Sequence, residues 1–273
     1  MRAFLLIAFI TFATMATKAS SDVHMFPDGS ATQWIVELPQ EIVGYVLFDC
    51  STVENRISPL LRFITVGELA TKGIQWASDY LAEEPAHKDW GISFIEIVKM
   101  GTFTIDDHSP EWPINGAAAL WMARVASSDS TVNLDLGLSL QVLEFWIPDI
   151  QYVAYMLKRG YYASYGDVTL QEDKNGTWRG RIDVEGLHAE AHCTPTGPII
   201  GGAGSSGQQS LFPPRFSTET GVVRVSLNGH RIQDCNEESL WQFSGDHALA
   251  NGILVGSSTY QFGYNLLGGV IFR

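Results

Sequence analysis

The sequence has few cysteines and few basic residues. The first shortage argues against a disulfide-rich protein, and the second against a protein that binds nucleic acid or anionic membranes. Three cysteines, Cys50, Cys193 and Cys235, are too few for a disulfide framework, so one bridge with one thiol and no bridge at all both remain open. The 17 basic residues face 30 acidic ones, for a net charge of −13. An acidic surface of this kind repels phosphate groups, so nucleic acid and anionic membranes are not expected partners.

Long apolar runs are also scarce, and after the N-terminus none reaches the length of about 18 residues that a membrane span requires. Residues 1–19, MRAFLLIAFITFATMATKA, combine one early basic residue, an apolar run and a small-x-small ending. This pattern predicts a secretory signal peptide. We expect residues 20–273 to form one soluble, secreted or vesicle-routed domain, with Asn175 of the N-x-[ST] sequon glycosylated. A homo-oligomer is compatible with this sequence.

Several catalytic and cofactor motifs are absent or lack their context. No G-x-S-x-G elbow occurs, which gives a serine hydrolase no support. Residues 202–207, GAGSSG, have the letters of a dinucleotide fingerprint but no βαβ unit around them, and we interpret them as a loop. His188 and His192 fall on the polar side of an alternating segment, while Asp106-Asp107-His108 and Asp246-His247 are typical of solvated loops. No metal and no cofactor are expected.

Short alternating or apolar segments, broken by turn residues, dominate the chain. Ile92–Phe103 alternates so that Ile92, Phe94 and Glu96 share one face, which predicts an inward-pointing carboxyl group. Val53–Leu61 predicts a short helix, and Val132–Trp146 is open between strand and helix. Further expected strands are Trp34–Phe48 with one break, Ala117–Val125, Trp178–Val184, Leu187–Cys193, Val222–Leu227, Ser239–Phe243, Thr259–Phe262 and Val270–Phe272. The pattern favours a mostly β, β-rich α+β protein built on one antiparallel β-barrel.

Residues 155–167, YMLKRGYYASYGD, raise the question of a reactive amine. Lys158 beside Arg159 could be a buried lysine of lowered pKa, as an imine-forming enzyme needs. Alternatively, Lys158 and Arg159 end a helix before Gly160, where cations interact favourably with the helix dipole. We favour the helix end.

From Val36 to Phe272 the order of segments resembles the acetoacetate decarboxylase-like superfamily. GYVLFDCSTVENRISPLLRF resembles its strand and helix before a leucine-proline turn, and Phe94-Ile95-Glu96 its aromatic-x-Glu, whose glutamate lies in the active site. LWQFSGDHALANGILVGSSTYQFGYNLLGGVIF resembles its closing strands and "DHA" segment. The resemblance implies a single barrel-centred domain with Glu96 in its pocket.

The resemblance departs from the family at the catalytic amine, which members take from a Pro-Lys-Lys-Leu run. Aligning the hairpin GDVTLQEDKNGTWRGRIDV with the strands after that run puts Tyr161 and Tyr162 at the lysine positions. The resemblance therefore implies a pocket that keeps Glu96 and has tyrosine in place of the Schiff-base lysine.

These observations lead to a cofactor-free lyase or cyclase as the main hypothesis. Glu96, Tyr161 and Tyr162 would catalyse dehydration or cyclisation, including a Diels–Alder type closure, of a hydrophobic polyketide or terpenoid in secondary metabolism. Two alternatives remain: a non-catalytic barrel that binds a small hydrophobic molecule, and an imine-forming decarboxylase or aldolase that uses Lys158 as nucleophile. The residues predicted to contact the substrate are Trp121, Tyr165, Arg62, Trp241 and Phe94.

Overall fold

Strands make up most of the chain, which confirms the mostly β fold class. The computed structural model describes residues 33–37, 40–99, 103–105, 116–128, 138–158, 163–202, 206–212, 220–261 and 264–272. Within these ranges no helix has both the length and the apolar character needed to cross a membrane. The predicted signal peptide, residues 1–19, lies outside the described residues.

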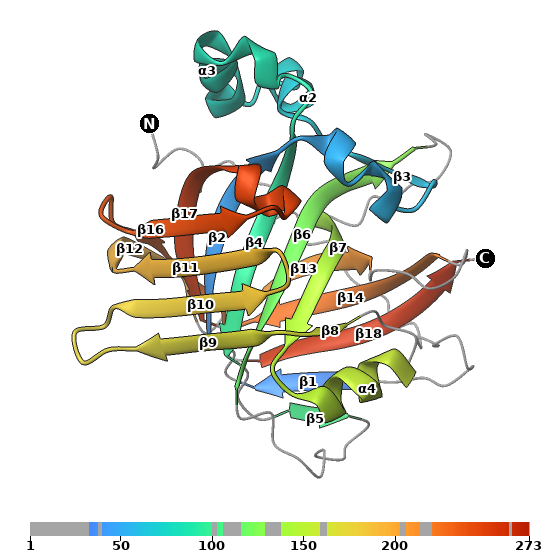
Figure 1. Cartoon of the computed structure of the whole chain (residues 1–273), viewed down its shortest axis with the longest axis vertical. Helices are drawn as coiled ribbons and strands as arrows, with labels where there is room; N and C mark the ends of the chain where they lie inside the picture. Colours follow the sequence, from blue (N-terminus) through green and yellow to red (C-terminus); the bar gives the residue numbers. More distant parts are fainter. Residues whose placement is uncertain are drawn as a thin grey trace.

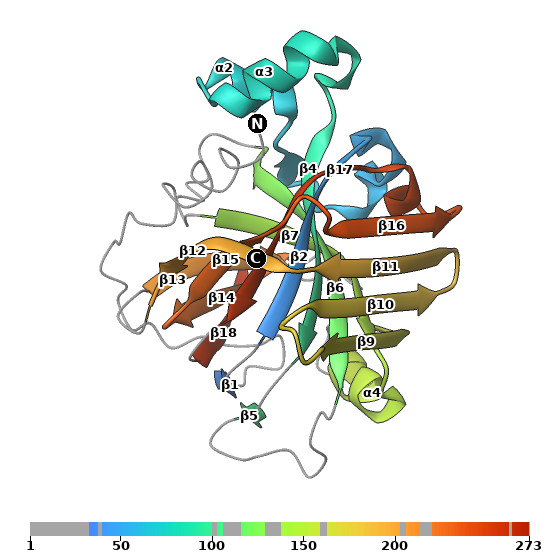
Figure 2. The same cartoon turned by 90° about the vertical axis from the view of Figure 1, so that its left-hand side faces the viewer.

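In the part of the chain that the structure describes, the larger of two sheets contains fourteen strands and bends around one concave face (Figures 1 and 2). Its order is β12 (Pro195–Gly201), β15 (Arg231–Cys235), β17 (Ile253–Gln261), β2 (Gln40–Phe48), β4 (Gly91–Lys99), β6 (Ala117–Ser127), β7 (Leu138–Ile147), β13 (Ser206–Phe212), β14 (Thr220–Asn228), β18 (Tyr264–Phe272), β1 (Gln33–Glu37) and β5 (Phe103–Ile105), with β3 (Leu61–Phe63) beside β6 and β8 (Ser164–Tyr165) beside β7. Neighbours are antiparallel, except that β7 runs parallel to β13 and β8. The strands described here end at β12 and β5 and do not close into a barrel.

The smaller sheet lies against the other, convex face of the larger one, as Figure 2 shows. Its order is β16 (Leu240–Gly245), β11 (Leu187–Cys193), β10 (Trp178–Val184) and β9 (Asp167–Glu172), all antiparallel. One side of this sheet is apolar and packs inward, and the other side faces outward. Every second residue of β10 and β11 is buried, while the residues between them are more exposed.

The described helices are short and lie at the edges of the sheets (Figure 1). They are α2 (Val66–Thr71), α3 (Gln75–Glu83) and α4 (Ile150–Lys158), with 3-10 turns η1 (Cys50–Thr52), η2 (Glu54–Arg56), η3 (Pro85–His87) and η4 (Ala248–Asn251). Thr65 caps the N-terminus of α2, because its side chain accepts a hydrogen bond from the backbone N–H of Glu68. Val66 of α2 and Trp76 of α3 pack on the apolar end of the concave face.

Two apolar cores occupy the two faces of the larger sheet, which explains why β2 and β4 are apolar along nearly their whole length. On the convex side, residues such as Ile42, Ile95 and Trp121 fill the layer between the sheets. On the concave side, residues such as Tyr45 and Phe94 form the second core together with α2 and α3.

The two sheets approach each other closely at Gly180 of β10. A Cβ atom at this position would lie 2.5 Å from Cδ1 of Ile97 and 2.8 Å from Cδ1 of Ile42, both on the larger sheet. A side chain here would therefore force the terminal methyl groups of both isoleucines to move, and a side chain larger than alanine would add further volume to this packed layer.

We expect Gly180→Val to lower the free energy of unfolding by about 1–3 kcal/mol, because the added side chain overpacks the layer between the sheets. Urea denaturation followed by tryptophan fluorescence measures this loss. Arg179→Val, on the exposed side of the same strand, is the matched control and should change stability little. Equal stability of Gly180→Val and the unmodified protein would contradict the close contact.

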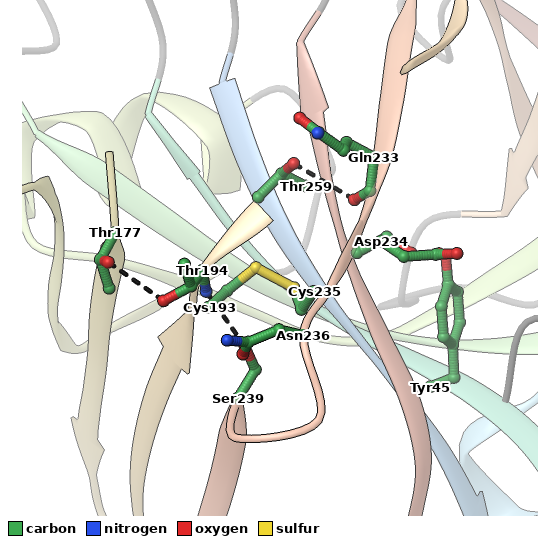
Figure 3. Close-up of a disulfide and its surroundings, with 11 residues drawn as sticks. Tyr45, Thr177, Cys193, Thr194, Gln233, Asp234, Cys235, Asn236, Ser239 and Thr259 are labelled. Carbon is green, nitrogen blue, oxygen red and sulfur yellow. Dashed lines mark hydrogen bonds between the residues drawn. A yellow bond between two sulfur atoms is a disulfide. The ribbon is translucent and has the colours of Figure 1, made fainter. Parts of the chain in front are cut away.

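One disulfide joins the two sheets. Cys193 at the end of β11 bonds to Cys235 at the end of β15, across 42 positions of sequence (Figure 3). Beside it, the hydroxyl groups of Thr177 and Thr194 lie 3.0 Å apart, and the backbone N–H of Thr194 donates to Oγ of Ser239 at 3.0 Å. The third cysteine, Cys50, is a partly buried thiol whose pKa burial raises to about 12, so it is not a reactive nucleophile.

The structure confirms most of the predicted strands and corrects two local predictions. The segment left open between strand and helix forms β7 over its described part. The helix predicted over Val53–Leu61 is wrong: η1 and η2 are single turns, and Leu61 already belongs to β3. Pro59 accounts for this difference, because the residue before a proline disfavours the helical region. Of the predicted loop 202–207, positions 206 and 207 begin β13 and positions 203–205 lie outside the described residues.

Candidate functional site

Titratable and aromatic side chains gather at the centre of the concave face. Alternation along β2 and β4 brings them there, since Tyr45 pairs with Phe94 and Val43 pairs with Glu96. Tyr260 of β17 lies directly opposite Glu41 of β2. Directly opposed residues of antiparallel strands share one face of the sheet. The acid–tyrosine cluster is defined here as Glu41, Tyr45, Glu96, Asp234, Ser258 and Tyr260.

Glu96 is set among apolar neighbours in the middle of β4. Its cross-strand partners are Val43 on β2 and Leu120 on β6, and the residue itself is partly buried. Burial disfavours the carboxylate and raises the pKa of Glu96 from its ordinary value of 4.5 to about 8. A carboxyl group with such a pKa exchanges its proton near neutral pH, as a general acid or base must.

A second carboxyl group, that of Glu41, lies on the same face. Val43 faces Glu96 across the β2–β4 pair, and Glu41 is two residues further along β2. Burial raises the pKa of Glu41 well above its ordinary value, and the nearby charge of Glu96 raises it further. Two carboxyl groups in this position disfavour the doubly ionised state.

Hydroxyl groups continue the cluster across three strands. Tyr45 Oη donates to Ser258 Oγ at 3.2 Å, and Ser258 Oγ donates to Asp234 Oδ1 at 3.1 Å. The hydroxyls of Tyr45 and Tyr260 lie 2.7 Å apart, and Tyr260 is the donor in this arrangement because the Tyr45 proton points to Ser258. Burial raises the pKa of Tyr45 to about 12 and that of Tyr260 well above its ordinary value. Both phenols therefore stay protonated and can act as hydrogen-bond donors.

Strand β6 adds a guanidinium group to the same face. Arg124 lies two residues beyond Met122, which belongs to the concave core. Burial lowers the pKa of Arg124, and the charge of Glu68 opposes that shift. The concave face is therefore acidic at its centre and carries a cation toward the α2 end.

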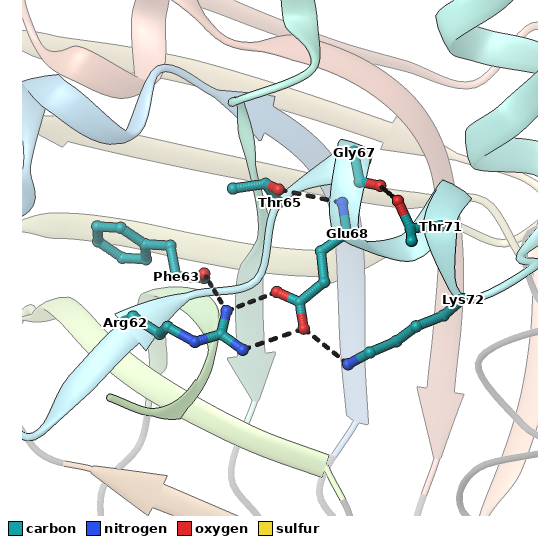
Figure 4. A network of polar contacts seen from close by, with 7 residues as sticks. All are labelled: Arg62, Phe63, Thr65, Gly67, Glu68, Thr71 and Lys72. Carbon is teal, nitrogen blue, oxygen red and sulfur yellow. Dashed lines mark hydrogen bonds and ion pairs between the residues drawn. The ribbon is translucent and has the colours of Figure 1, made fainter. Parts of the chain in front are cut away.

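Arg62, one of the residues predicted to bind the substrate, forms an ion pair with Glu68 at the edge of this region (Figure 4). Its guanidinium group donates to both carboxylate oxygens of Glu68, at 2.5 and 3.1 Å, and Lys72 Nζ donates to one of them at 2.7 Å. The hydrogen bonds from Arg62, with those from Lys72, lower the pKa of Glu68 to about 2. Arg62 is an exposed residue and is not brought to Glu96.

The other predicted substrate contacts divide between the two faces. Phe94 lies two residues from Glu96 on the concave face and packs edge-on against Tyr45, with ring centroids 5.7 Å apart. Trp121 and Trp241 lie in the core between the sheets, on the opposite face from Glu96, and Trp121 is 0% exposed. Tyr165 of β8 is 59% exposed at the sheet edge. Only Phe94 of this group is therefore adjacent to Glu96.

The segment around the predicted catalytic tyrosines is only partly described. Tyr161 and Tyr162 lie outside the described residues. Lys158 is the last residue of α4, in agreement with the predicted helix end, and its side chain is not among those described. Asn175 is exposed in the turn between β9 and β10.

Three of the histidines singled out in the sequence, His188, His192 and His247, lie away from the acid–tyrosine cluster. His247 packs against Trp121 in the layer between the sheets, with Nε2 3.8 Å from Glu144 Oε1. His188 and His192 lie on the outer side of β11, as predicted. Within the described part of the chain, no group of three or more histidine, cysteine, aspartate or glutamate residues is arranged to hold a metal ion. Asp106-Asp107-His108 lies outside it.

Sequence reasoning found Glu96 but missed Glu41, Tyr45 and Tyr260. The signal for two of them was present, because Glu41 and Tyr45 alternate with Val43 exactly as period-two strand geometry requires of one face. Tyr260 carried no comparable signal, since its contact with Tyr45 spans 215 positions of sequence.

Comparisons with known proteins give structural matches alone. No protein-family model and no curated protein sequence matches the chain. An acetoacetate decarboxylase-like enzyme from Sphingomonas wittichii has a TM-score of 0.54 and 13% identity, covering 93% of this chain and 100% of its own. Acetoacetate decarboxylase from Legionella pneumophila has a TM-score of 0.53 and 9% identity, covering 95% and 93%. The enduracididine biosynthesis enzyme MppR has a TM-score of 0.50 and 11% identity, covering 95% and 98%.

These matches span nearly the whole of each chain at very low identity, so what they establish is the fold. The solved proteins that share it include a decarboxylase and a biosynthetic enzyme. The chain therefore has the acetoacetate decarboxylase-like fold.

Proposed function

We propose that this protein is a secretory-route enzyme that eliminates water from a hydrophobic hydroxylated substrate and guides the product into ring closure, including pericyclic closure. The observation that carries the proposal is Glu96, a carboxyl group on the apolar concave face whose pKa is raised to about 8. A carboxyl group of this kind can protonate a leaving hydroxyl or remove a proton next to a carbonyl.

The neighbouring side chains supply the remaining requirements of such a reaction. Tyr45 and Tyr260 keep their protons, and a phenol that turns its proton from its present acceptor, Ser258 or Tyr45, can donate to a carbonyl oxygen that becomes negative during proton removal. Phe94 and Leu120 offer apolar contact to a polyketide or terpenoid skeleton. Holding a flexible product in a folded shape favours cyclisation by proximity.

Two further observations support the secretory route. The Cys193–Cys235 disulfide is the kind of bond that persists in oxidising compartments. The sequon at Asn175 stands in an exposed turn, which suits N-glycosylation. With a net charge of −13, a small neutral molecule remains a better candidate partner than nucleic acid.

The test uses a probe whose dehydration is easy to follow, the aldol of benzaldehyde and acetone, within a panel of hydroxylated aryl and terpenoid ketones. The choice also follows MppR, which was captured with the condensation product of pyruvate and imidazole 4-carboxaldehyde. We expect the protein to accelerate formation of the conjugated enone, read by its near-ultraviolet absorbance. Glu190→Gln, an exposed carboxyl on the smaller sheet, is the matched control. Panel members that bind without any acceleration would instead indicate a non-catalytic ligand-binding protein.

A separate measurement addresses an imine mechanism through Lys158. Helix α4 ends at Lys158, where a cation interacts favourably with the helix dipole, so we expect no covalent chemistry from this amine. Intact mass after incubation with small β-keto acids and borohydride should reveal no adduct that Lys158→Ala removes. A Lys158-dependent adduct would establish Schiff-base chemistry and replace the dehydration proposal.

A further inference from the structure

We infer that Glu41 is a second acid/base residue of this site, and that Glu41 and Glu96 exchange a proton as one pair during the elimination of water. The inference rests on the proposed dehydration and extends it with a residue for which neither the sequence nor the fold matches gave a role. It is carried by the placement of the two side chains on adjacent strands.

The register of three strands sets this placement. Val43 pairs with Glu96 between β2 and β4, so Glu41, two residues along β2, is the diagonal neighbour of Glu96 on the same face. Diagonal neighbours lie about 7–8 Å apart at the backbone, and long side chains bridge much of that distance. On the other side of β2, Tyr260 lies directly opposite Glu41. The two carboxyl groups therefore flank one small area, with a phenol beside them.

The ionisable groups around Glu41 and Glu96 disfavour negative charge on both carboxyl groups at once. Tyr45 on β2, Tyr260 on β17 and Asp234 on β15 add groups that are either neutral or, once ionised, negative. Strand β6 contributes apolar Leu120 directly opposite Glu96, and its cation, Arg124, lies four residues further along the strand. The charge of Glu96 acts on Glu41 and on both phenols. Ionising one carboxyl group therefore disfavours ionising the other, and over an interval of pH the pair holds a single proton.

A singly protonated pair performs an elimination without any other reagent. The carboxylate removes a proton from the carbon next to the substrate carbonyl, and the C–H electron pair becomes the new carbon–carbon double bond. The C–O bond to the leaving hydroxyl breaks, and the hydroxyl takes the proton of the carboxylic acid and departs as water. The pair again holds one proton, now on the other member, and a transfer between the two restores the starting state.

The first arm of the test needs no substrate. Infrared difference spectra of the unmodified protein as a function of pH should show two buried carboxyl groups that titrate above the ordinary glutamate range, in two steps. Glu41→Gln and Glu96→Gln should each leave one step, and in Glu96→Gln the remaining step should move to lower pH because the neighbouring charge is gone. An unchanged titration in Glu41→Gln would overturn the pair, whatever the reaction proves to be.

The second arm measures turnover of the aldol probe against pH. The unmodified protein should give a bell-shaped profile, because only the singly protonated pair reacts. Glu41→Gln should lose about 10²-fold or more in kcat and one limb of the bell, while Glu41→Asp should restore part of the rate. A coupled titration together with full activity of Glu41→Gln would remove Glu41 from the mechanism. If the unmodified protein turns over no member of the panel, the dehydration proposal fails, and the acid/base role of Glu41 fails with it. The titration still decides, independently of turnover, whether the two carboxyl groups are coupled.

Discussion

Glu96→Gln is expected to reduce turnover of the aldol probe by about 10²- to 10⁴-fold, the range that a positioned general acid or base contributes. Glutamine preserves the shape of the side chain and can still accept a hydrogen bond, but it cannot exchange a proton. Because the partners of Glu96 on β2 and β6 are Val43 and Leu120, no titratable side chain directly opposite it on either strand can take its place. The rate of enone formation at saturating probe is the measurement.

The stability of the same variant separates lost chemistry from lost folding. The pKa of Glu96 is about 8 in the folded protein against an ordinary 4.5, so between these values the folded state binds more protons than the unfolded state. The free energy of unfolding of the unmodified protein therefore declines as pH rises through this window. Glu96→Gln has no such contribution and should be the more stable protein above pH 8. If the inactive variant is also unfolded at every pH, its loss of rate comes from lost folding and gives no support to a role of Glu96 in proton transfer.

Removing the disulfide is expected to have the largest effect on stability. The double variant Cys193→Ser with Cys235→Ser opens a loop of 42 positions, for which the entropy of the unfolded chain predicts a loss of about 4 kcal/mol, with about 2–4 kcal/mol typical. The bond also fastens β15 of the larger sheet to β11 of the smaller one, so the layer between the sheets should loosen with it. Urea denaturation monitored by circular dichroism measures the change.

The matched control for this variant is Cys50→Ser, which removes a thiol that is not bonded. We expect its effect to be clearly smaller, since Cys50 is only partly buried beside the core. A double variant as stable as the unmodified protein would mean that the bond places no constraint on the unfolded chain.

Periodicity predicted those features that depend on one strand at a time. The alternation of Ile92, Phe94 and Glu96 was enough to point the carboxyl group toward a core, and β4 has that arrangement. The hairpin of β9 and β10 was also predictable, because its turn residues separate two clean alternating runs.

Periodicity could not predict what depends on the order of strands in the sheet. Trp121 belongs to β6, which is apolar on both sides, so the sequence carries no sign of which face meets the smaller sheet. The neighbours of β2 are β4 and β17, which come from opposite ends of the chain. The pairing of Glu41 with Tyr260 therefore became visible only in the folded structure.

The disulfide also sets the covalent connectivity of the molecule. The chain between Cys193 and Cys235 contains β12, β13, β14 and β15 up to Asp234, whereas Glu41 and Glu96 precede this interval and Tyr260 follows it. A single peptide-bond cleavage within the interval would leave one covalently linked molecule, with every member of the acid–tyrosine cluster except Asp234 outside the cut segment. The two halves of the candidate site are thus joined by two routes, one through the backbone and one through sulfur.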